Sequence, residues 1–488
     1  MANQQRTALT ESLLVRQSLD DNINEDNGRS GSGGDGGVPN LAASSVTTIL
    51  VLSAFVNACI AFGFGNAVGY SSPTQSEITE DLGLSVAEFS LFGSLLTIGA
   101  MLGAVISGKI IDFLGRKGTM WILNLFYIGG WLAIAFTKVS WLLDLGRFVL
   151  GFRNGIAGFL MPVYVAEVAP KNLRGTISAL GTLMVCWGLS FMYVVGSFVN
   201  WRTLALIATI PGLLQLPLLF FIPESPRWLA KVGRQKDLEV ALQSLRGDKV
   251  DISEEATEIK DYTESLQSAS EGSILDVFQK KYIRPLLIFA GLLILQSLGG
   301  IAAIAYYSGA IFLSAGISSM VGLVTLAIVQ TLLGALGISL VDKVGRRPVL
   351  LVCSAGLCLG SFLTGLSFLL QDFNCWDQGA PYFALIGLLL YMASYTLVAG
   401  MTWLLVSEVF PVNVKGSAGS ICNFVSNVFN WIVAYFFNFL IQWSSAGIFF
   451  IFSAFCGASF LLGAAMVPET KGRTLEEIQA SMFSHSME

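Results

Sequence analysis

Residues 46–70, VTTILVLSAFVNACIAFGFGNAVGY, contain no charged side chain. A transmembrane helix needs about 20 mostly apolar residues, so this run is long enough to cross a bilayer. The composition matches, because 54% of the 488 residues are hydrophobic and only 12% are charged, about half the fraction of soluble domains. Only helices and closed barrels span membranes, and the run lacks the polar–apolar alternation of barrel strands. The chain is therefore predicted to be an all-α membrane protein.

Apolar runs of this kind recur along the chain. The twelve expected transmembrane helices lie at 46–70, 90–111, 118–137, 141–162, 177–198, 204–222, 283–314, 320–341, 348–370, 382–406, 417–441 and 446–467. The long charged segment between the sixth and seventh runs divides them into two sets of six. The predicted parts are a disordered cytosolic tail at 1–45, a six-helix bundle at 46–222, a cytosolic linker at 223–282, a second six-helix bundle at 283–467 and a cytosolic tail at 468–488. The linker is expected to hold short surface helices such as Gln235–Arg246.

Basic residues predict the orientation of the helices. Of the 28 Lys and Arg, only Lys138, Arg147, Arg153 and Arg202 fall outside the side that holds both termini, which leaves 28 − 4 = 24 there. Loops rich in Lys and Arg stay in the cytosol. Both termini are therefore expected to be cytosolic.

Three charged motifs recur in the same order in the two sets of helices. The matched segments are 108–117 with 342–347, Glu167 and Arg174 with Glu408 and Lys415, and 223–227 with 468–473. This duplication indicates two similar halves. We expect these charges to form a cytosolic latch that pairs in the outward-facing state and separates in the inward-facing one; the simpler alternative is topology signals and helix caps. The expected latch residues are Asp112, Arg116, Glu167, Arg174, Glu224, Arg227, Asp342, Arg346, Glu408, Lys415 and Glu469.

The motifs resemble those of the major facilitator superfamily sugar porters over residues 45 to the end. The matching stretches are GKIIDFLGRK at 108–117, Gly146–Arg147, PVYVAE at 162–167, PESPRWL at 223–229 and PETKGR at 468–473. Within that family the chain is most similar to the plant early-responsive-to-dehydration-like sugar transporters, through VGYSSP at 68–73, NWRTLA at 200–205 and GRTLEEI at 472–478. The resemblance implies the major facilitator fold and sugar transport.

The resemblance also implies a central cavity where amides and aromatic side chains hold a sugar. The matching positions are Gln296, Tyr306, Tyr307, Trp403 and Asn430; the less favoured alternative is that the aromatic residues are core packing. This chain departs from the family pattern at Ser297, Ala302 and Thr182, where the usual residues are amides, and at Thr402, where it is proline. Ser297 and Thr182 are still expected to contact the substrate. Each lost hydrogen bond costs on the order of 1 kcal/mol, so the departures predict low affinity or a different solute.

Two arginines lie within the fourth predicted helix. Arg147 is expected to pair with a carboxylate or with carbonyls near the cavity. Arg153 is unusual, since an arginine near the middle of a membrane costs at least about 2.5 kcal/mol unless it faces a cavity or a partner. We favour a structural partner for Arg153 over direct recognition of an anionic solute.

Catalytic chemistry finds little support in the sequence. The only histidine is His485, and the seven cysteines show no paired spacing, so no metal site, cofactor or nucleophile–base set is expected. A net charge of −5 gives no reason to expect a nucleic-acid partner. The chain is therefore interpreted as a carrier and not an enzyme. It is expected to be monomeric or weakly associated, with the lipid bilayer and a small sugar as its partners.

The energy coupling of transport and the membrane in which the protein resides are predicted from less evidence. No Asp or Glu lies deep in an expected helix, so facilitated diffusion of a hexose is favoured over proton symport. Leu9, Leu13 and Leu14 resemble the Leu-x-x-x-Leu-Leu sorting signal of vacuolar relatives, which favours the vacuolar membrane over the plasma membrane. The rival hypotheses are a carrier of an organic anion or another plant metabolite, and a sugar sensor that does not transport.

Overall fold

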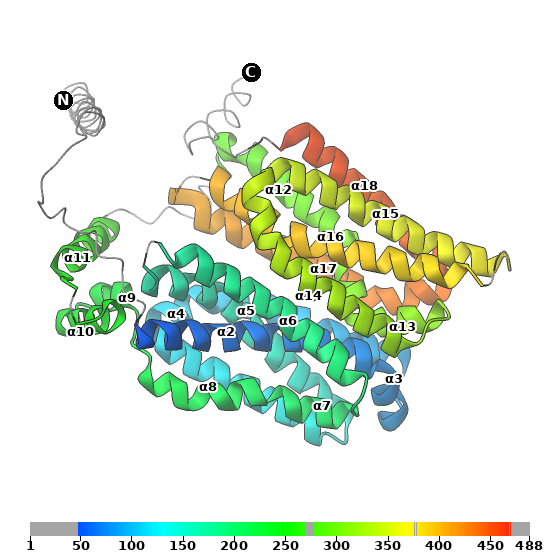
Figure 1. The fold of residues 1–488 in the computed structure, drawn as a ribbon, viewed down its shortest axis with the longest axis horizontal. Helices are drawn as coiled ribbons and strands as arrows, with labels where there is room; N and C mark the ends of the chain where they lie inside the picture. The colour runs from blue at the N-terminus through cyan, green and yellow to red at the C-terminus, as the bar shows by residue number, and fades with distance from the viewer. Residues whose placement is uncertain are drawn as a thin grey trace, which may run out of the picture. The chain divides into compact units, whose positions relative to one another are not determined.

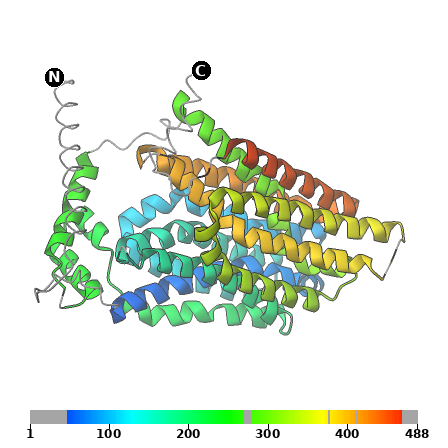
Figure 2. The same cartoon turned by 45° about the horizontal axis from the view of Figure 1, so that its top comes forward.

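Every element in the described part of the chain is a helix. The computed structural model describes residues 47–170, 172–248, 250–268, 278–374, 376, 378–410, 412–467 and 469. The predicted tail at 1–45, with Leu9, Leu13 and Leu14, lies outside these residues, as does almost all of the tail at 468–488. Residues 46–488 cluster as one compact unit. Figures 1 and 2 show α2 to α8 side by side in one group of helices and α12 to α18 in another.

The described helices fall into three sets along the chain. The first set is α2 (Thr48–Gly69), α3 (Ser71–Leu82), α4 (Val86–Phe136), α5 (Ser140–Val168), α6 (Arg174–Gly196), α7 (Trp201–Ala208) and α8 (Ile210–Phe221). The linker holds α9 (Pro226–Lys231), α10 (Gln235–Arg246) and α11 (Ser253–Ser268). The last set is α12 (Lys280–Leu298), α13 (Ile301–Ser314), α14 (Ser319–Val344), α15 (Arg346–Asp372), α16 (Ala380–Val409), α17 (Val412–Trp443) and α18 (Ser445–Met466).

The number of membrane spans in the described residues agrees with the sequence. Eleven helical segments are long and apolar enough to cross a bilayer, and one of them is α4, with 51 residues. A helix that long would extend about 76 Å at 1.5 Å per residue, more than twice the bilayer core. Gly115 breaks it, with φ 78° and ψ 175°, a conformation open essentially only to glycine. The two arms of α4 are therefore separate spans, and 11 + 1 gives the twelve expected.

The predicted helices differ from the structure mainly at breaks. The span expected at 204–222 is divided into α7 and α8 at Thr209, because Pro211 in the first turn of α8 has no N–H with which to continue the previous helix. The span expected at 283–314 is divided at Gly299–Gly300, where Gly300 has φ 97°. The polar helix α3 was not expected, since its sequence lacks an apolar run.

Glycines bring α4 and α5 into close contact. A Cβ at Gly151 would lie 2.2 Å from the Leu96 carbonyl oxygen, and one at Gly155 would lie 2.1 Å from the Ala100 oxygen. From the other helix, a Cβ at Gly103 would lie 2.1 Å from the Phe152 oxygen. Small residues on facing helices allow backbones to approach in this way, which supplies packing energy in lipid. The two helices form a tight pair.

The linker helices lie at one end of the helical unit, here named the linker side (Figure 1). Arg246, at the end of α10, donates through NH1 to the carbonyl of Val168 at 3.0 Å. Its Nε and NH2 donate to the two carboxylate oxygens of Glu255 on α11, at 2.9 and 2.7 Å. Leu229, Leu238 and Leu242 form a small core between these helices. The linker is thus attached to the last residue of α5.

Candidate functional site

A cavity of about 570 Å³ lies between the two groups of helices. Its lining comes from α2, α4, α5 and α6 on one side and from α13, α14, α16 and α17 on the other. The volume is typical of small-molecule sites, which measure about 300–1,000 Å³. The amide side chains in the lining are Asn57, Asn154, Gln330, Asn427 and Asn430, and hydroxyl groups come from Thr97, Thr182 and Tyr306, among others.

The lining of the cavity carries no formal charge. No Asp, Glu, Lys, Arg or His is found among the described residues that line it. Three buried amide oxygens accept no hydrogen bond, namely Asn57 Oδ1, Gln330 Oε1 and Asn430 Oδ1. A buried oxygen without a donor is costly, so each of these side chains would gain a hydrogen bond by turning its oxygen toward a ligand hydroxyl. The cavity therefore suits an uncharged polar molecule.

Three of the predicted substrate-contacting residues line this cavity. They are Thr182 on α6, Tyr306 on α13 and Asn430 on α17. The Tyr306 hydroxyl hydrogen-bonds the Thr97 hydroxyl at 3.2 Å, so α13 and α4 meet at the cavity. Ala302, the position where the family has an asparagine, also lines the cavity with its methyl group.

Four predicted substrate-contacting residues do not line the cavity in this structure. Gln296 Nε2 donates to Thr402 Oγ1 at 3.0 Å, and the threonine hydroxyl donates back to Gln296 Oε1 at 3.2 Å. Two others, Ser297 and Tyr307, likewise make contacts elsewhere. Ser297 bonds the Ser426 hydroxyl, the Tyr307 hydroxyl donates to the Ala434 carbonyl, and Trp403 is 39% exposed.

Sequence analysis missed four amides of the lining. Asn57, Asn154, Gln330 and Asn427 each interrupt a largely apolar run. A polar side chain within a transmembrane helix is costly unless it faces a partner or a cavity. This signal was present in the sequence, although it could not show which amides share one cavity.

Arg147 and Arg153 are both buried, and neither lines the cavity. Arg147 donates to the Ala67 carbonyl at 2.5 Å and to the Ser71 hydroxyl at 3.1 Å, and its guanidinium lies over the ring of Phe92. Carbonyl and ring contacts of this kind stabilise a guanidinium away from water. Arg153 has partners of the same type within its own helical group. Neither arginine contacts the cavity contents directly.

The cavity is closed on the side opposite the linker. Ser72 Oγ accepts from the Gly309 amide at 2.9 Å, and a Cβ at Gly309 would lie 2.5 Å from the Ser72 carbonyl oxygen. Asn438 donates to the Ser90 hydroxyl at 3.0 Å, and the Tyr193 hydroxyl donates to a carbonyl of α13. These contacts join the two groups of helices directly. In the other direction the lining continues along α5 and α6 toward the linker side.

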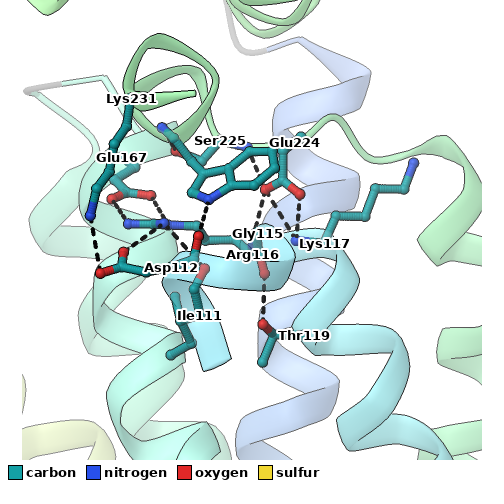
Figure 3. Close-up of polar contacts among 11 residues, drawn as sticks. Ile111, Asp112, Gly115, Arg116, Lys117, Thr119, Glu167, Glu224, Ser225 and Lys231 are labelled. Carbon is teal, nitrogen blue, oxygen red and sulfur yellow. Dashed lines mark hydrogen bonds and ion pairs between the residues drawn. The ribbon is translucent and has the colours of Figure 1, made fainter. Parts of the chain in front are cut away.

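The first copy of the charged motifs forms a connected cluster on the linker side (Figure 3). Arg116 makes a bidentate pair with Glu167, with both N···O distances 2.7 Å and both side chains 10% exposed. Asp112 pairs with Lys231 of α9 at 3.0 Å. Glu224 caps the second arm of α4 by accepting the backbone N–H of Arg116 at 2.8 Å. Burial raises the pKa of the Glu224 carboxyl, although these backbone donors act in the opposite direction.

The second copy repeats the cap. Gly345 has φ 105° and ψ 159°, like Gly115, and Glu469 accepts the backbone N–H groups of Arg346 and Arg347 at 3.1 and 3.3 Å. The two glutamates thus serve as helix caps. The remaining predicted latch residues lie as follows: the guanidinium of Arg227 is over the Tyr262 ring of α11, Arg174 begins α6, and the side chains of Asp342, Glu408 and Lys415 lie outside the described part of the chain.

Known proteins resemble this chain in sequence. A model of the family described as "Sugar (and other) transporter" matches residues 45–482. The chain is 48% identical over 448 residues to "Sugar transporter ERD6-like 15" of Arabidopsis thaliana, which covers 91% of this chain and 94% of the relative. It is 46% identical over 438 residues to "Sugar transporter ESL1" of the same plant, with 90% and 93% covered.

Solved structures share the fold. The inward open conformation of the xylose transporter XylE from E. coli has a TM-score of 0.74 at 24% sequence identity and covers 89% of this chain and 99% of that one. The proton:xylose symporter XylE bound to 6-bromo-6-deoxy-D-glucose has a TM-score of 0.70 at 24% identity, with 88% and 98% covered. The predicted all-α major facilitator fold is confirmed by this match.

Proposed function

Because the chain belongs to the sugar transporter family of the major facilitator superfamily, we propose that it moves a monosaccharide down its gradient by facilitated diffusion. It is a multi-pass membrane protein, and membership of a transporter family confirms that it is not an enzyme. The observation that supports a hexose best is the uncharged cavity with three unsatisfied amide oxygens, because sugar hydroxyls supply donors of that kind. The aromatic ring of Tyr306 offers a face for sugar C–H groups.

The proposal of downhill transport rests on the lining of the cavity. A proton-coupled carrier needs a titratable group that the substrate site can sense. No carboxylate or histidine is present in the described lining. Uptake is therefore expected to be independent of a proton gradient.

Alternating access is the proposed mechanism. The two six-helix groups, 46–222 and 283–467, would rock about the cavity as rigid halves. Contacts such as Ser72 with Gly309 close one side, and we assign the linker side to the cytosol from the distribution of basic residues, so this conformation corresponds to an inward-facing state. The paired charges around Arg116 would exchange partners across the halves when the cavity turns outward.

The vacuolar membrane is the proposed location. The support is the sequence Leu9-Thr10-Glu11-Ser12-Leu13-Leu14. A fluorescent fusion in which Leu13 and Leu14 are replaced by alanine should leave the vacuolar membrane. Unchanged localisation of that variant would rule out the signal.

The rival functions make different predictions. The organic-anion hypothesis depended on Arg153 and on the missing family amides, and of these Arg153 does not line the cavity. A sensor would bind sugar without moving it. Flux therefore separates a carrier from a sensor, and competition by a charged analogue separates a sugar carrier from an anion carrier.

The deciding experiment is uptake of labelled D-glucose into proteoliposomes that hold the purified protein, with and without an imposed proton gradient. Saturable uptake that is indifferent to the gradient and to excess D-gluconate is the expected result. Accumulation driven by the gradient would overturn facilitated diffusion. Competition by gluconate would overturn the proposal that the cargo is uncharged. Glucose binding without flux would favour the sensor hypothesis.

A further inference from the structure

Arg153 is held behind the cavity wall by three contacts. Its NH2 group donates to the Ile60 carbonyl at 3.1 Å, and the guanidinium lies over the Tyr127 ring at 4.9 Å. Its NH1 group donates to the side-chain oxygen of Asn154 at 3.0 Å. Arg153 itself is 2% exposed. The guanidinium therefore reaches the cavity only through its neighbour.

Asn154 is the neighbour that faces the cavity. It lines the cavity together with Met161 and Val165, which lie seven and eleven residues further along α5. Residues at this spacing fall on one face of a helix, so the cavity face of α5 begins at Asn154 and Arg153 belongs to the adjoining face. The Asn154 nitrogen donates a long hydrogen bond of 3.4 Å to the Phe64 carbonyl, and the amide has a second N–H.

We propose that Arg153 is a positioning residue that fixes the amide of Asn154, so that Asn154 presents an N–H donor to an oxygen of the bound solute. This inference rests on the proposed function. In a free asparagine the oxygen and nitrogen exchange places at little cost, and the hydrogen-bond network decides the orientation. A flipped Asn154 would place its NH2 group 3.0 Å from a guanidinium nitrogen, where two donors oppose each other.

The strength of the contact supports this role. Hydrogen bonds from a charged donor are roughly twice as strong as neutral ones, and this one is buried from water. The close packing of Gly151 and Gly155 against α4 also holds the backbone on either side of Asn154 in place. Both the helix and the amide are therefore fixed before a solute binds.

Asn154 differs in chemistry from the other amides described above. Asn57, Gln330 and Asn430 offer unpartnered oxygens, which recognise the hydrogen of a hydroxyl group. Asn154 offers an N–H donor, which recognises the oxygen of a hydroxyl group. Fluorine accepts hydrogen bonds and does not donate them, so a fluorosugar can replace a hydroxyl that accepts from Asn154 but not one that donates to an unpartnered amide oxygen. A deoxy sugar has neither a donor nor an acceptor at that position, so it cannot replace the hydroxyl in either kind of contact.

The test measures inhibition of labelled D-glucose uptake by a panel of singly deoxygenated D-glucoses and the matching fluorinated sugars. In the wild-type protein we expect one position of the sugar at which the fluoro analogue inhibits about three- to tenfold better than the deoxy analogue. Arg153→Met should reduce that difference to less than about twofold, because the amide is then free to turn. The inhibition profile, which is the difference in inhibition between the fluoro and deoxy analogues at each position of the sugar, should not change at the other positions.

Asn154→Asp is the matched variant. The carboxylate keeps an ionic partner for Arg153, but it replaces the N–H donor by an acceptor and loses the long hydrogen bond to the Phe64 carbonyl, so folding is checked by the apparent unfolding temperature. The fluoro analogue should then inhibit no better than the deoxy analogue. If Arg153→Met does not fold, Arg153→Lys takes its place. An ammonium lacks the planar fork with which the guanidinium reaches both the Asn154 side-chain oxygen and the Ile60 carbonyl oxygen.

The outcomes separate the two levels of the proposal. An unchanged profile in folded Asn154→Asp would show that Asn154 does not contact the solute. A profile altered by Asn154→Asp but not by the folded arginine variant would show that Arg153 does not orient it. Absence of glucose uptake in the wild-type protein would overturn the proposed function itself, whatever the variants do.

Discussion

Replacement of Gly155 by alanine tests how closely α5 packs on α4. The added Cβ would lie 2.1 Å from the Ala100 oxygen and 2.7 Å from the Ala104 nitrogen, both of which are backbone atoms. Real Cβ atoms do not approach other atoms to less than 3.0 Å, so the helices must separate by about 3.0 − 2.1 = 0.9 Å. Overpacking of this kind costs about 1–3 kcal/mol. We expect Gly155→Ala to destabilise the protein by that amount.

Gly158, on the same helix, supplies the control. A Cβ there would meet no atom within 4 Å, so Gly158→Ala should stabilise α5 by up to about 1 kcal/mol through helix propensity. The two variants should then differ by about 1–4 kcal/mol. The measurement is the apparent unfolding temperature of the purified protein in detergent at one fixed heating rate. Equal unfolding temperatures for both variants would refute the close contact.

Two further predictions concern the latch and the cavity. Glu408→Gln should lower glucose uptake several-fold if Glu408, the repeat partner of Glu167, holds the outward-facing state; transport at the wild-type rate would contradict the latch. Cys186 lines the cavity, so saturating D-glucose should slow its modification by a maleimide, with Cys186→Ser as the control for labelling of the other six cysteines. A labelling rate that does not respond to glucose would place the sugar elsewhere.

The sequence predicted the number and order of the spans well, because crossing a bilayer requires long apolar runs. It could not predict the break at Gly300, since a glycine within an apolar run is also compatible with an unbroken helix. The extra helix α3 was missed for a related reason. Its polar residues give no membrane signal, and only the continuous backbone after Tyr70 shows it.

The candidate site was predicted less completely. Thr182, Tyr306 and Asn430 line the cavity, and their contact with a solute stays a prediction, whereas the Gln296 amide is hydrogen-bonded to the Thr402 hydroxyl. Both the lipid-facing and the cavity-facing sides of such helices are largely apolar, so the sequence does not reveal which way each helix is turned. One partner of Arg153 is its direct neighbour in sequence, Asn154, yet only the structure shows that the two side chains meet.

The attachment of the linker to α5 gives this protein a lever arm. Arg246 connects α10 to the Val168 carbonyl and to Glu255, so a tilt of α5 is transmitted to α9, α10 and α11 together. The linker helices extend away from the end of α5, and the displacement produced by a given tilt increases with distance from the pivot. Small rotations at the cavity wall are thereby magnified in the aqueous phase, where a dye pair placed on the linker and on the second group of helices could record each transport cycle as a change in distance.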